Sequence, residues 1–125
     1  DQGDYKAALE YYRQDIVICR KISDRGGEGT ALNNLAAVAY AQGEQDKALS
    51  YLEQSLIISR EIDDLAGEAV TNWNIGFAYN DQGNLRRAEH YINRAVQLAK
   101  RIGHPNREEY RQALEELRAK LPAGR

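Results

Sequence analysis

One short phrase of sequence recurs at a constant spacing, and this repetition limits the possible folds more than any other feature. A glutamine–glycine pair ends at Gly3, Gly43 and Gly83, so the period is 40 residues, and an alanine and a tyrosine follow each glycine at the same distances. A period of about 20–50 residues is typical of repeat arrays, in which each unit buries its apolar face only against its neighbours. The sequence therefore predicts a repeat protein.

The pattern inside each unit is helical. Apolar residues lie three and four positions apart, with almost no strand-like alternation, as in Ala31, Leu32, Leu35, Ala36 and Ala39. Glycine closes a helix without a Cβ clash by taking the left-handed conformation, so we expect this role for Gly43, Gly83 and, by analogy, Gly3. We therefore expect an all-α fold of about six helices in up-down order.

The repeat phrase also predicts how the chain is organised. Because Gly3 corresponds to the middle of a unit, residues 1–25 are interpreted as the second helix of a truncated repeat, followed by full repeats at 26–65 and 66–105 and a capping helix at 106–121. Residues 1–125 then form a single array fragment of a longer protein. On this interpretation the stripe of Leu9, Tyr12, Ile16 and Cys19 lacks a covering helix, and the amino-terminal edge is expected to be adhesive.

The carboxyl-terminal segment differs from the other units. Its apolar stripe has moved, and Glu115 and Glu116 occupy the positions that hold an apolar pair earlier in the chain; the stripe consists of Tyr110, Ala113, Leu114, Leu117 and Leu121. One interpretation is a cap, because a terminal repeat needs a polar outer face to stop further stacking. The other is that this helix folds into the groove and occupies it like a ligand. Both stay open at this point.

Charge and hydropathy exclude several classes of partner. Charged residues make up 29% of the chain but the formal net charge is only −2, so no basic surface for nucleic acid is expected. No apolar run approaches the roughly 20 residues that span a bilayer, so no membrane partner is expected. The single cysteine, Cys19, is compatible with a cytoplasmic location.

No pattern of catalytic or metal-binding residues is found. His90 and His104 are not at metal-ligand spacing with a cysteine or a carboxylate cluster, so neither a metal nor a cofactor is predicted. Neighbouring carboxylates such as Glu115 and Glu116 point about 100° apart on a helix, which is wrong for shared acid and base work. We therefore predict that the protein is not an enzyme.

A group of residues in the third unit resembles the signature of the tetratricopeptide repeat family, which is a leucine–glycine pair, a tyrosine, a turn glycine and two packing alanines. The residues are Ile75, Gly76, Tyr79, Gly83, Ala88 and Ala95. The 40-residue period is similar to that of spindle-orientation adaptors, kinesin light chains and bacterial signalling proteins of this family. Two departures are Ala39 in place of the tyrosine and Asn72 in place of a tryptophan. The resemblance implies an α-solenoid of stacked antiparallel hairpins whose first helices build a concave, peptide-binding wall.

Helical geometry then predicts which residues face that groove. A helix that buries Ile75, Gly76 and Tyr79 turns a set of other positions the opposite way, namely Val70, Trp73, Asn74, Phe77, Asn80 and Asp81, with Asn33, Asn34 and Tyr40 among the equivalents one unit earlier. The amides of Asn34 and Asn74 suit a peptide backbone, since each offers donors and an acceptor. Trp73 and Phe77 suit an apolar anchor. The structural alternative is that the asparagines are only solvated and the two aromatic rings are wedged between neighbouring first helices.

The sequence thus predicts a protein–protein interaction scaffold that binds a partner peptide or helix in its concave groove, as a module of a larger protein. The alternative is an assembly element that pairs with itself through the amino-terminal edge near Leu9 and Ile16. A weaker alternative is a sensor for a small peptide signal.

Overall fold

The computed structural model describes residues 2–122, and within them every regular element is an α-helix. The elements are α1 (Gln2–Lys21), α2 (Arg25–Ala41), α3 (Gln45–Glu61), α4 (Leu65–Asp81), α5 (Leu85–Ile102) and α6 (Arg107–Lys120). This result confirms the all-α class and the six helices expected from the sequence.

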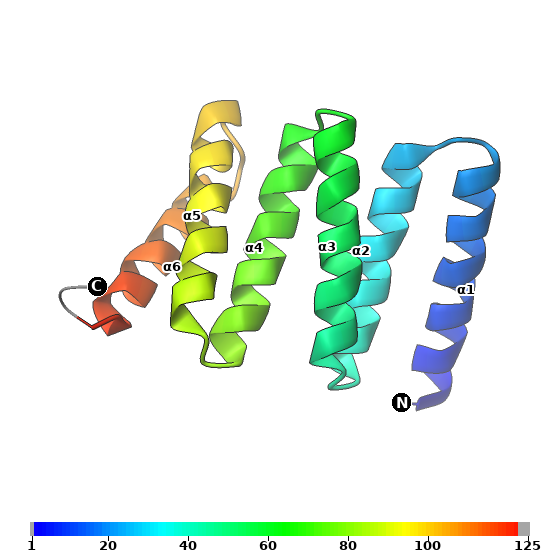
Figure 1. Ribbon diagram of the computed structural model, residues 1–125, viewed down its shortest axis with the longest axis horizontal. Helices are drawn as coiled ribbons and strands as arrows, with labels where there is room; N and C mark the ends of the chain where they lie inside the picture. The colour runs from blue at the N-terminus through cyan, green and yellow to red at the C-terminus, as the bar shows by residue number, and fades with distance from the viewer. Residues whose placement is uncertain (1, 123–125) are drawn as a thin grey trace. The chain divides into compact units, whose positions relative to one another are not determined.

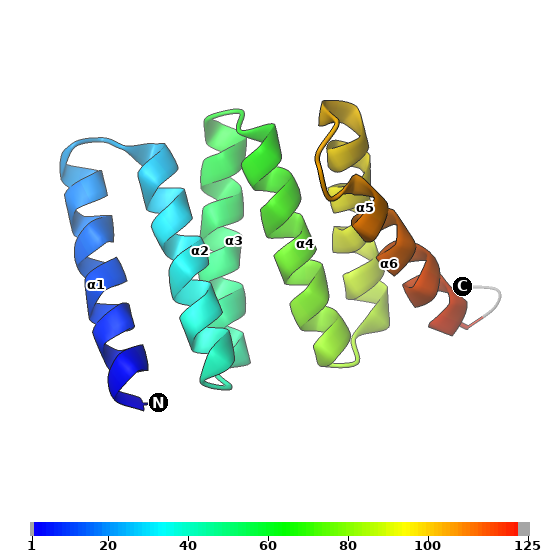
Figure 2. The same ribbon diagram turned by 180° about the vertical axis from the view of Figure 1, so that it is seen from behind.

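Contacts between the helices divide the chain into two units, each with its own core. Unit 1 is Asp1–Asp63 and contains α1, α2 and α3, whereas unit 2 is Asp64–Arg125 and contains α4, α5 and α6. Within each unit consecutive helices run in opposite directions, and each packs against the next (Figure 1; Figure 2). Both units are therefore built from antiparallel hairpins.

The helix ends follow from a few short polar residues and glycines. The carboxylates of Asp24 and Asp64 accept hydrogen bonds from the backbone N–H groups of Gly27 and Gly67, at 2.8 and 2.9 Å, and so cap the first helix of a hairpin in each unit. Gly43 and Gly83 have φ values of 80° and 78°, as predicted for helix-closing glycines.

The prediction for Gly3 is wrong, because this residue lies inside α1. A closing glycine needs a helical turn before it whose carbonyl groups it can satisfy, and none precedes Gly3 in the described residues. In the described residues, Gly3 therefore shares the repeated phrase with Gly43 and Gly83 but does not share their left-handed conformation.

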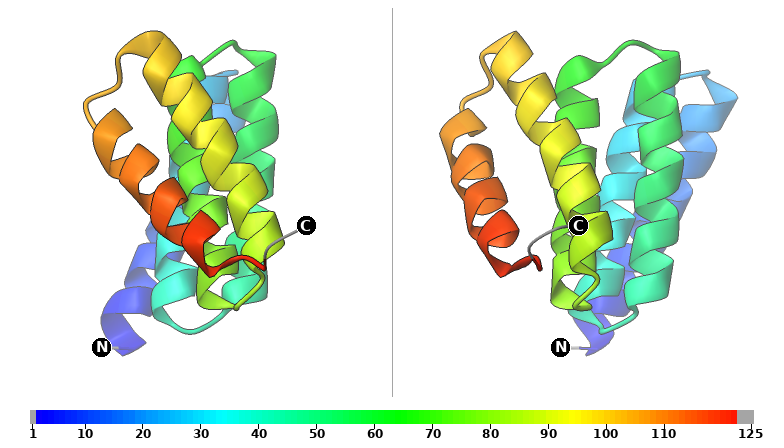
Figure 3. Two further views of the ribbon diagram at one scale, coloured as in Figure 1. Left: turned by 90° about the vertical axis from the view of Figure 1, so that its left-hand side faces the viewer. Right: turned by 60° about the vertical axis from the view of Figure 1, so that its left-hand side comes forward.

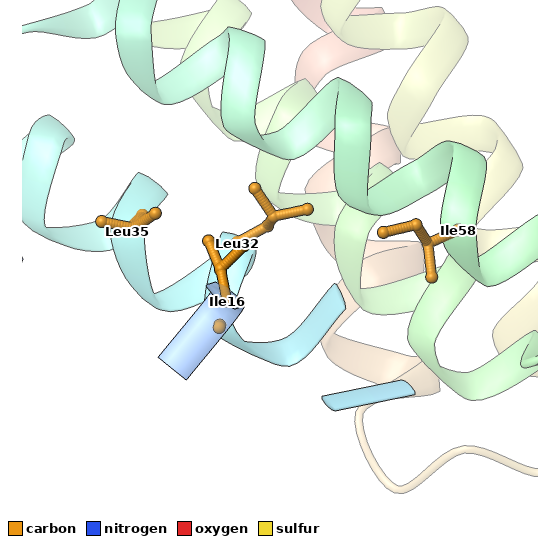
Figure 4. Close-up of a cluster of buried hydrophobic side chains, with 5 residues drawn as sticks. Ile16, Leu32, Leu35 and Ile58 are labelled. Carbon is orange, nitrogen blue, oxygen red and sulfur yellow. The ribbon is translucent and has the colours of Figure 1, made fainter. Parts of the chain in front are cut away.

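The core of unit 1 joins all three of its helices. Ile16 of α1, Leu32 and Leu35 of α2 and Ile58 of α3 meet in one apolar cluster (Figure 4), with Ala31 and the partly buried Leu9, Tyr12 and Tyr51 packed around it. Burial of each large aliphatic side chain contributes about 1.5–3 kcal/mol. The cluster fixes α1 to α2.

This packing overturns the expectation that the stripe of Leu9, Tyr12, Ile16 and Cys19 is uncovered. Ile16 is only 7% exposed and Cys19 only 6%, because this stripe faces the following helix, α2. The exposed apolar residues of α1 lie on another face, which includes Tyr11 and Ile18. Periodicity showed that the stripe is apolar but gave no information about which neighbour covers it.

Close contact between α4 and α5 defines the core of unit 2. A Cβ atom added to Gly76 would lie 2.5 Å from Cγ1 of Ile92 and 3.2 Å from the backbone oxygen of Ala88, so only glycine fits at this crossing. Further along α5, Ala95 and Ala99 pack with Tyr110 of α6 and with the partly buried Trp73. Small residues thus allow the three helices to approach one another.

Helix α6 packs against α5 (Figure 3). It buries most of its predicted apolar stripe. Tyr110, Leu114 and Leu117 are buried, whereas Arg111 on the exposed side forms ion pairs with Glu108 and Glu115. A helix with one apolar and one charged face covers its neighbour and presents water-compatible groups outward, and its role as a cap stays a prediction.

Candidate functional site

The predicted groove residues of α4 all lie off its buried face. The helix buries Ile75, Ala78 and Tyr79 on one side, and Phe77, on the opposite side, is 49% exposed. Asp81 is exposed, and the remaining members are half-buried, namely Val70, Trp73, Asn74 and Asn80. The exposed phenylalanine and the half-buried tryptophan lie one helical turn apart, so they form a small apolar area that makes this face a candidate binding surface.

A hollow lies between this face and α6. It measures about 170 Å³ and is lined by Trp73, Phe77 and Asn80 of α4, Ile92 of α5, and Ala113, Glu116, Leu117 and Lys120 of α6. We call it the α4–α6 hollow. The hollow leaves part of the α4 surface open beside α6. The two interpretations of the carboxyl-terminal helix, a cap or an occupant of the groove, both stay predictions.

Trp73 forms one wall of the hollow and is held in place by ring stacking. Its ring stacks on that of Tyr110 with centroids 4.3 Å apart and an interplanar angle of 13°, and Tyr110 stacks in turn on His104 at 5.6 Å. Burial raises the pKa of the Tyr110 hydroxyl above its usual range, and a hydrogen bond with Asn106 opposes this shift. The ring of Trp73 is therefore packed between α4 and α6, which is the kind of structural role that the sequence left open for it.

The rim of the hollow is polar on the α6 side. Glu116 and Lys120 lie one helical turn apart on α6, and neither forms an ion pair with any residue in the part of the chain that the structure describes. Asn80 of α4 adds an amide to the opposite side. The hollow consequently combines an apolar floor with one acidic, one basic and one amide group at its edge.

Residues of α5 and α6 were not among the sequence-predicted site residues. From the sequence, Glu116 is one of two neighbouring carboxylates with no catalytic role, and Leu117 belongs to the apolar stripe of the carboxyl-terminal segment. The sequence gave only a weak signal that these α6 residues form part of a site. They lie one, three and four positions apart, and residues on one face of any helix have this spacing. Their role depends on where α6 packs.

The predicted site residues in unit 1 lie on α2. Asn33, Asn34 and Tyr40 are all half-buried, and the hydroxyl oxygen of Tyr40 is buried without a hydrogen-bond partner among the described residues. Asn34 and Asn74 belong to different units, and the amide ladder that would include both stays a prediction.

Unit 1 also contains a buried charge cluster that sequence reasoning missed. Glu28 of α2 is buried and accepts hydrogen bonds from Arg20 and Arg25, each at 2.9 Å, and Arg25 also pairs with Glu61 at 2.6 Å. Burial alone would raise the pKa of Glu28, but the two arginines outweigh it and the pKa is lowered. All members are paired with one another, so we assign the cluster to joining α1, α2 and α3.

The remaining reactive side chains have ordinary surroundings. Nδ1 of His104 accepts a hydrogen bond from the backbone N–H of Asn106 at 3.0 Å, and His90 lies edge-on to the ring of Tyr91. Cys19 is buried, and burial raises the pKa of its thiol, as do the nearby carboxylates of Asp15 and Asp24. No helix among the described residues is both long and apolar enough to span a bilayer.

Comparisons with known proteins agree with this geometry. Models of the tetratricopeptide repeat match residues 1–61 and 69–101. Among solved structures, a Podospora anserina protein described as a kinesin light chain with nearly identical TPR-like repeats aligns over 93% of this chain with a TM-score of 0.75 and 20% identity. BtubC (BKLC) from P. vanneervenii aligns over 98% with a TM-score of 0.69 and 19% identity. No curated protein matches.

Helical hairpins in series, each with an exposed first-helix face, define the class of helical repeat proteins. Within this class, the chain belongs to the tetratricopeptide repeat family. Repeats of this family generally mediate protein–protein interactions and are typically non-enzymatic scaffold modules. The chain spans 58% and 61% of the lengths of the two similar structures, and identities near 20% show a shared fold only.

Proposed function

We propose that this protein binds a segment of a partner protein along the exposed face of α4, with one large apolar side chain of the partner inserted into the α4–α6 hollow. The observation that carries the proposal is a hollow lined on its α4 side by two aromatic residues, the half-exposed Phe77 and the stacked ring of Trp73. Large aromatic side chains in well-packed pockets dominate the binding energy of protein interfaces.

The size of the hollow supports a peptide side chain as its occupant. A volume of about 170 Å³ is well below the roughly 300–1,000 Å³ of pockets that enclose small-molecule ligands. A single side chain fits, and its backbone then lies across the rim. Asn74 and Asn80 on α4 supply amides to the peptide backbone, and Glu116 and Lys120 on α6 supply both signs of charge to flanking residues.

The other predicted site residues extend this proposal. Val70 and Asp81 lie near the two ends of α4 and would contact the partner on either side of its anchor. On α2 we propose the same type of role for Asn33, Asn34 and Tyr40, whose positions in their helix correspond to those of the α4 residues. The partner is a protein segment on this account, and its sequence is set by the hollow more than by the amides.

Selection from a library of displayed random peptides tests the proposal. We expect the selected peptides to share a large apolar side chain and to lose at least about tenfold in affinity on Phe77→Ala, since truncation of an anchor costs about 2 kcal/mol or more. Phe77 is half-exposed, so this variant is expected to fold.

A matched control is Val17→Ala in α1, because Val17 is an apolar residue of similar exposure, 51%, in the other unit. It is expected to bind the selected peptides as the wild type does. Peptides that bind equally well to wild type and to Phe77→Ala, or no enrichment at all, would refute the proposed site.

The sequence alternative of an assembly element now depends on different residues. Ile16 is buried against α2, so self-association cannot use the stripe first predicted for it. The exposed apolar residues of α1 form a separate surface with its own chemistry.

A further inference from the structure

The exposed side of α5 is basic and contains no acidic residue. Eight residues of this helix are exposed, and five of them are arginine or lysine. The eight are Arg86, Arg87, His90, Arg94, Gln97, Lys100, Arg101 and Ile102. Glu89, the only acidic residue of α5, has a side chain that is 18% exposed and pairs with Arg118 of α6 at 2.9 Å. The helix therefore presents only positive and neutral groups to the solvent.

Most of these basic residues share one stripe along the helix. At about 100° per residue, Arg86, His90, Arg94 and Arg101 lie within an arc of about 80°, and two more basic residues lie at its edges. The stripe is about 22 Å long, since an α-helix rises 1.5 Å per residue. We call the six residues Arg86, Arg87, His90, Arg94, Lys100 and Arg101 the basic face of α5.

Much of the charge on the basic face is not neutralised within the chain. Arg86, Lys100 and Arg101 form no ion pair with any residue from 2 to 122. Arg94 pairs with Glu68 of α4 at 3.2 Å, but its side chain is still 47% exposed. The guanidinium and ammonium groups of this face are therefore available to an external anion.

Two arginines of the basic face lie where the helix gains nothing from them. Arg86 and Arg87 are in the first turn of α5, which contains no acidic residue, whereas the first turn of every other described helix contains one. The amino-terminal end of a helix dipole is positive, so it disfavours cations. Arg87 is nevertheless held in place, because its Nη1 donates to the hydroxyl of Tyr79 at 3.2 Å. Helix stability does not explain these charges.

The internal repeat shows that the fold does not require this charge. At the eight positions that are exposed in α5 the formal charge is +5, whereas it is 0 one period earlier and +2 two periods earlier. Asp46 and Glu61 of α3 hold the positions of the two arginines at the ends of the stripe. The charged residues at these positions are Asp46, Lys47, Arg60 and Glu61 in α3, and Lys6, Glu10, Arg20 and Lys21 in α1. The basic face is therefore a feature of α5 and not of the repeat.

The charge of the remaining chain favours a narrow acidic partner. Five basic residues and one acidic residue give α5 a formal charge of +4, so the rest of the chain has −6 within a total of −2. A bilayer or a nucleic-acid duplex presents phosphates over a surface wider than one helix. It would bring them against this acidic remainder, where like charges repel. A single extended segment can contact the stripe alone.

The spacing of the stripe also fits an extended acidic segment. Residues four positions apart on a helix are separated by about 6 Å along its axis. Alternate side chains of an extended strand lie about 6.8 Å apart on one side, so successive carboxylates can reach successive basic residues. An arginine donates two parallel hydrogen bonds to a carboxylate, which suits the three arginines of the stripe.

We propose that the basic face of α5 binds a segment of a partner protein that is rich in aspartate and glutamate and lies extended along the helix. The contact is electrostatic, in contrast to the apolar anchor of the α4–α6 hollow. None of the six residues lines the hollow, so this surface does not depend on the function proposed above.

An acidic peptide of simple sequence tests the proposal. The probe is a peptide of about ten glutamates, which is long enough to span the stripe when extended, and a peptide of the same number of glutamines is its uncharged match. Binding is followed by NMR shifts of the backbone amides of the full chain. We expect the glutamate peptide to shift amides of α5 and to lose affinity as salt is added, because salt screens exposed charges. The glutamine peptide is not expected to bind.

A pair of double variants makes the test specific. Arg86→Glu with Arg101→Glu reverses the charge at both ends of the stripe, so we expect a loss of affinity of at least about tenfold as repulsion replaces attraction. Both residues are exposed and form no ion pair among the described residues, so the variant is expected to fold, as circular dichroism can check. The matched control is Lys6→Glu with Lys21→Glu, at the same two positions of α1. It changes the net charge equally and is expected to bind as the wild type does.

Four results would overturn the proposal. No shift of α5 amides by the glutamate peptide would show that the face does not bind acidic segments. Equal losses in the two double variants would show a response to net charge alone. Tighter binding of a DNA duplex or of phosphatidylserine vesicles than of the glutamate peptide, at the same salt, would assign the face to that polyanion. A dimer in sedimentation that Arg86→Glu with Arg101→Glu dissociates would assign it to a second copy.

Discussion

Replacing glycine by alanine is expected to have opposite effects on stability at the two glycines that lie at helix crossings. Gly76 lies where α4 crosses α5, and Gly29 lies where α2 crosses α3, both inside helices and both buried. Replacing glycine by alanine in a helix interior gains about 0.8–1 kcal/mol, because alanine loses less conformational entropy on folding. The sign of the total effect is then decided by what the added methyl group meets.

At Gly76 the methyl group meets backbone as well as side chain. It would lie 2.5 Å from Cγ1 of Ile92, 3.1 Å from the backbone nitrogen of Ile92 and 3.2 Å from the backbone oxygen of Ala88. A side chain can rotate away, but the backbone of α5 can be relieved only by moving the helix. Overpacking of this kind costs about 1–3 kcal/mol, so Gly76→Ala is expected to destabilise the protein by up to about 2 kcal/mol after the helix gain is subtracted.

At Gly29 the nearest atoms are Cγ2 of Ile58 at 3.4 Å and Oγ of Ser55 at 3.7 Å, which are ordinary contact distances. The equivalent residue of unit 2, Ala69, already carries this methyl group. Gly29→Ala is therefore expected to stabilise the protein by about 1 kcal/mol.

Urea denaturation followed by circular dichroism at the helical band measures both variants. We expect the midpoint to fall for Gly76→Ala and to rise for Gly29→Ala, with thermal midpoints shifted by several degrees per kcal/mol in the same directions. A Gly76→Ala protein as stable as the wild type would show that α4 and α5 are not as close as described. A destabilised Gly29→Ala would refute the argument from contact distances.

Three further substitutions test other parts of the structure. Glu28→Gln should reduce the acid sensitivity of folding. The pKa of Glu28 is lowered in the folded state, so its stabilisation is present above the ordinary carboxyl pKa near 4.5 and is lost as the pH falls. By urea midpoints, the wild type should lose more stability than the variant between about pH 5 and pH 3. Asp63→Gly should raise the melting temperature, because Asp63 has a φ of 56° and the left-handed conformation costs a residue other than glycine about 1–2 kcal/mol. An unchanged or lower melting temperature would contradict this argument. Tyr110→Ala should cost about 3–5 kcal/mol and shift the fluorescence of Trp73 to longer wavelength, whereas Tyr110→Phe should keep the emission, and a Tyr110→Ala spectrum like that of the wild type would refute the stacking.

Much of the fold is predictable from the sequence because its signals are local. The carboxylates of Asp24 and Asp64 cap helices through backbone groups three residues away, and Gly43 and Gly83 adopt a conformation that only their own backbone decides. Apolar spacing within a helix gives the stripe, and the constant period gives the hairpins. These features depend on residues that are close in sequence, so they can be predicted without knowing the tertiary contacts.

The failures concern neighbours that are distant in sequence. The stripe that contains Ile16 was correctly identified as apolar, but it was expected to be uncovered, whereas α2 covers it. The stack of Trp73 on Tyr110 joins two helices through a crossing geometry that neither local sequence specifies. Glu116 and Lys120 resemble any solvated charges, and they become rim groups only because α6 packs beside α4. The spacing of residues in the sequence predicts which side chains share one face of a helix. Which helices these faces contact can be learned only from the folded structure.

The most direct test of the proposed binding face uses the only tryptophan of the chain, Trp73, which lines the hollow. The measurement is a titration of the protein with a peptide from the random-library selection, followed by tryptophan emission. We predict that the emission of Trp73 changes and saturates over the range of peptide concentration in which the peptide binds. Phe77→Ala should remove this change, and Val17→Ala should preserve it. Tight binding of the peptide, shown independently by calorimetry, with no change in the emission of Trp73 would contradict the account.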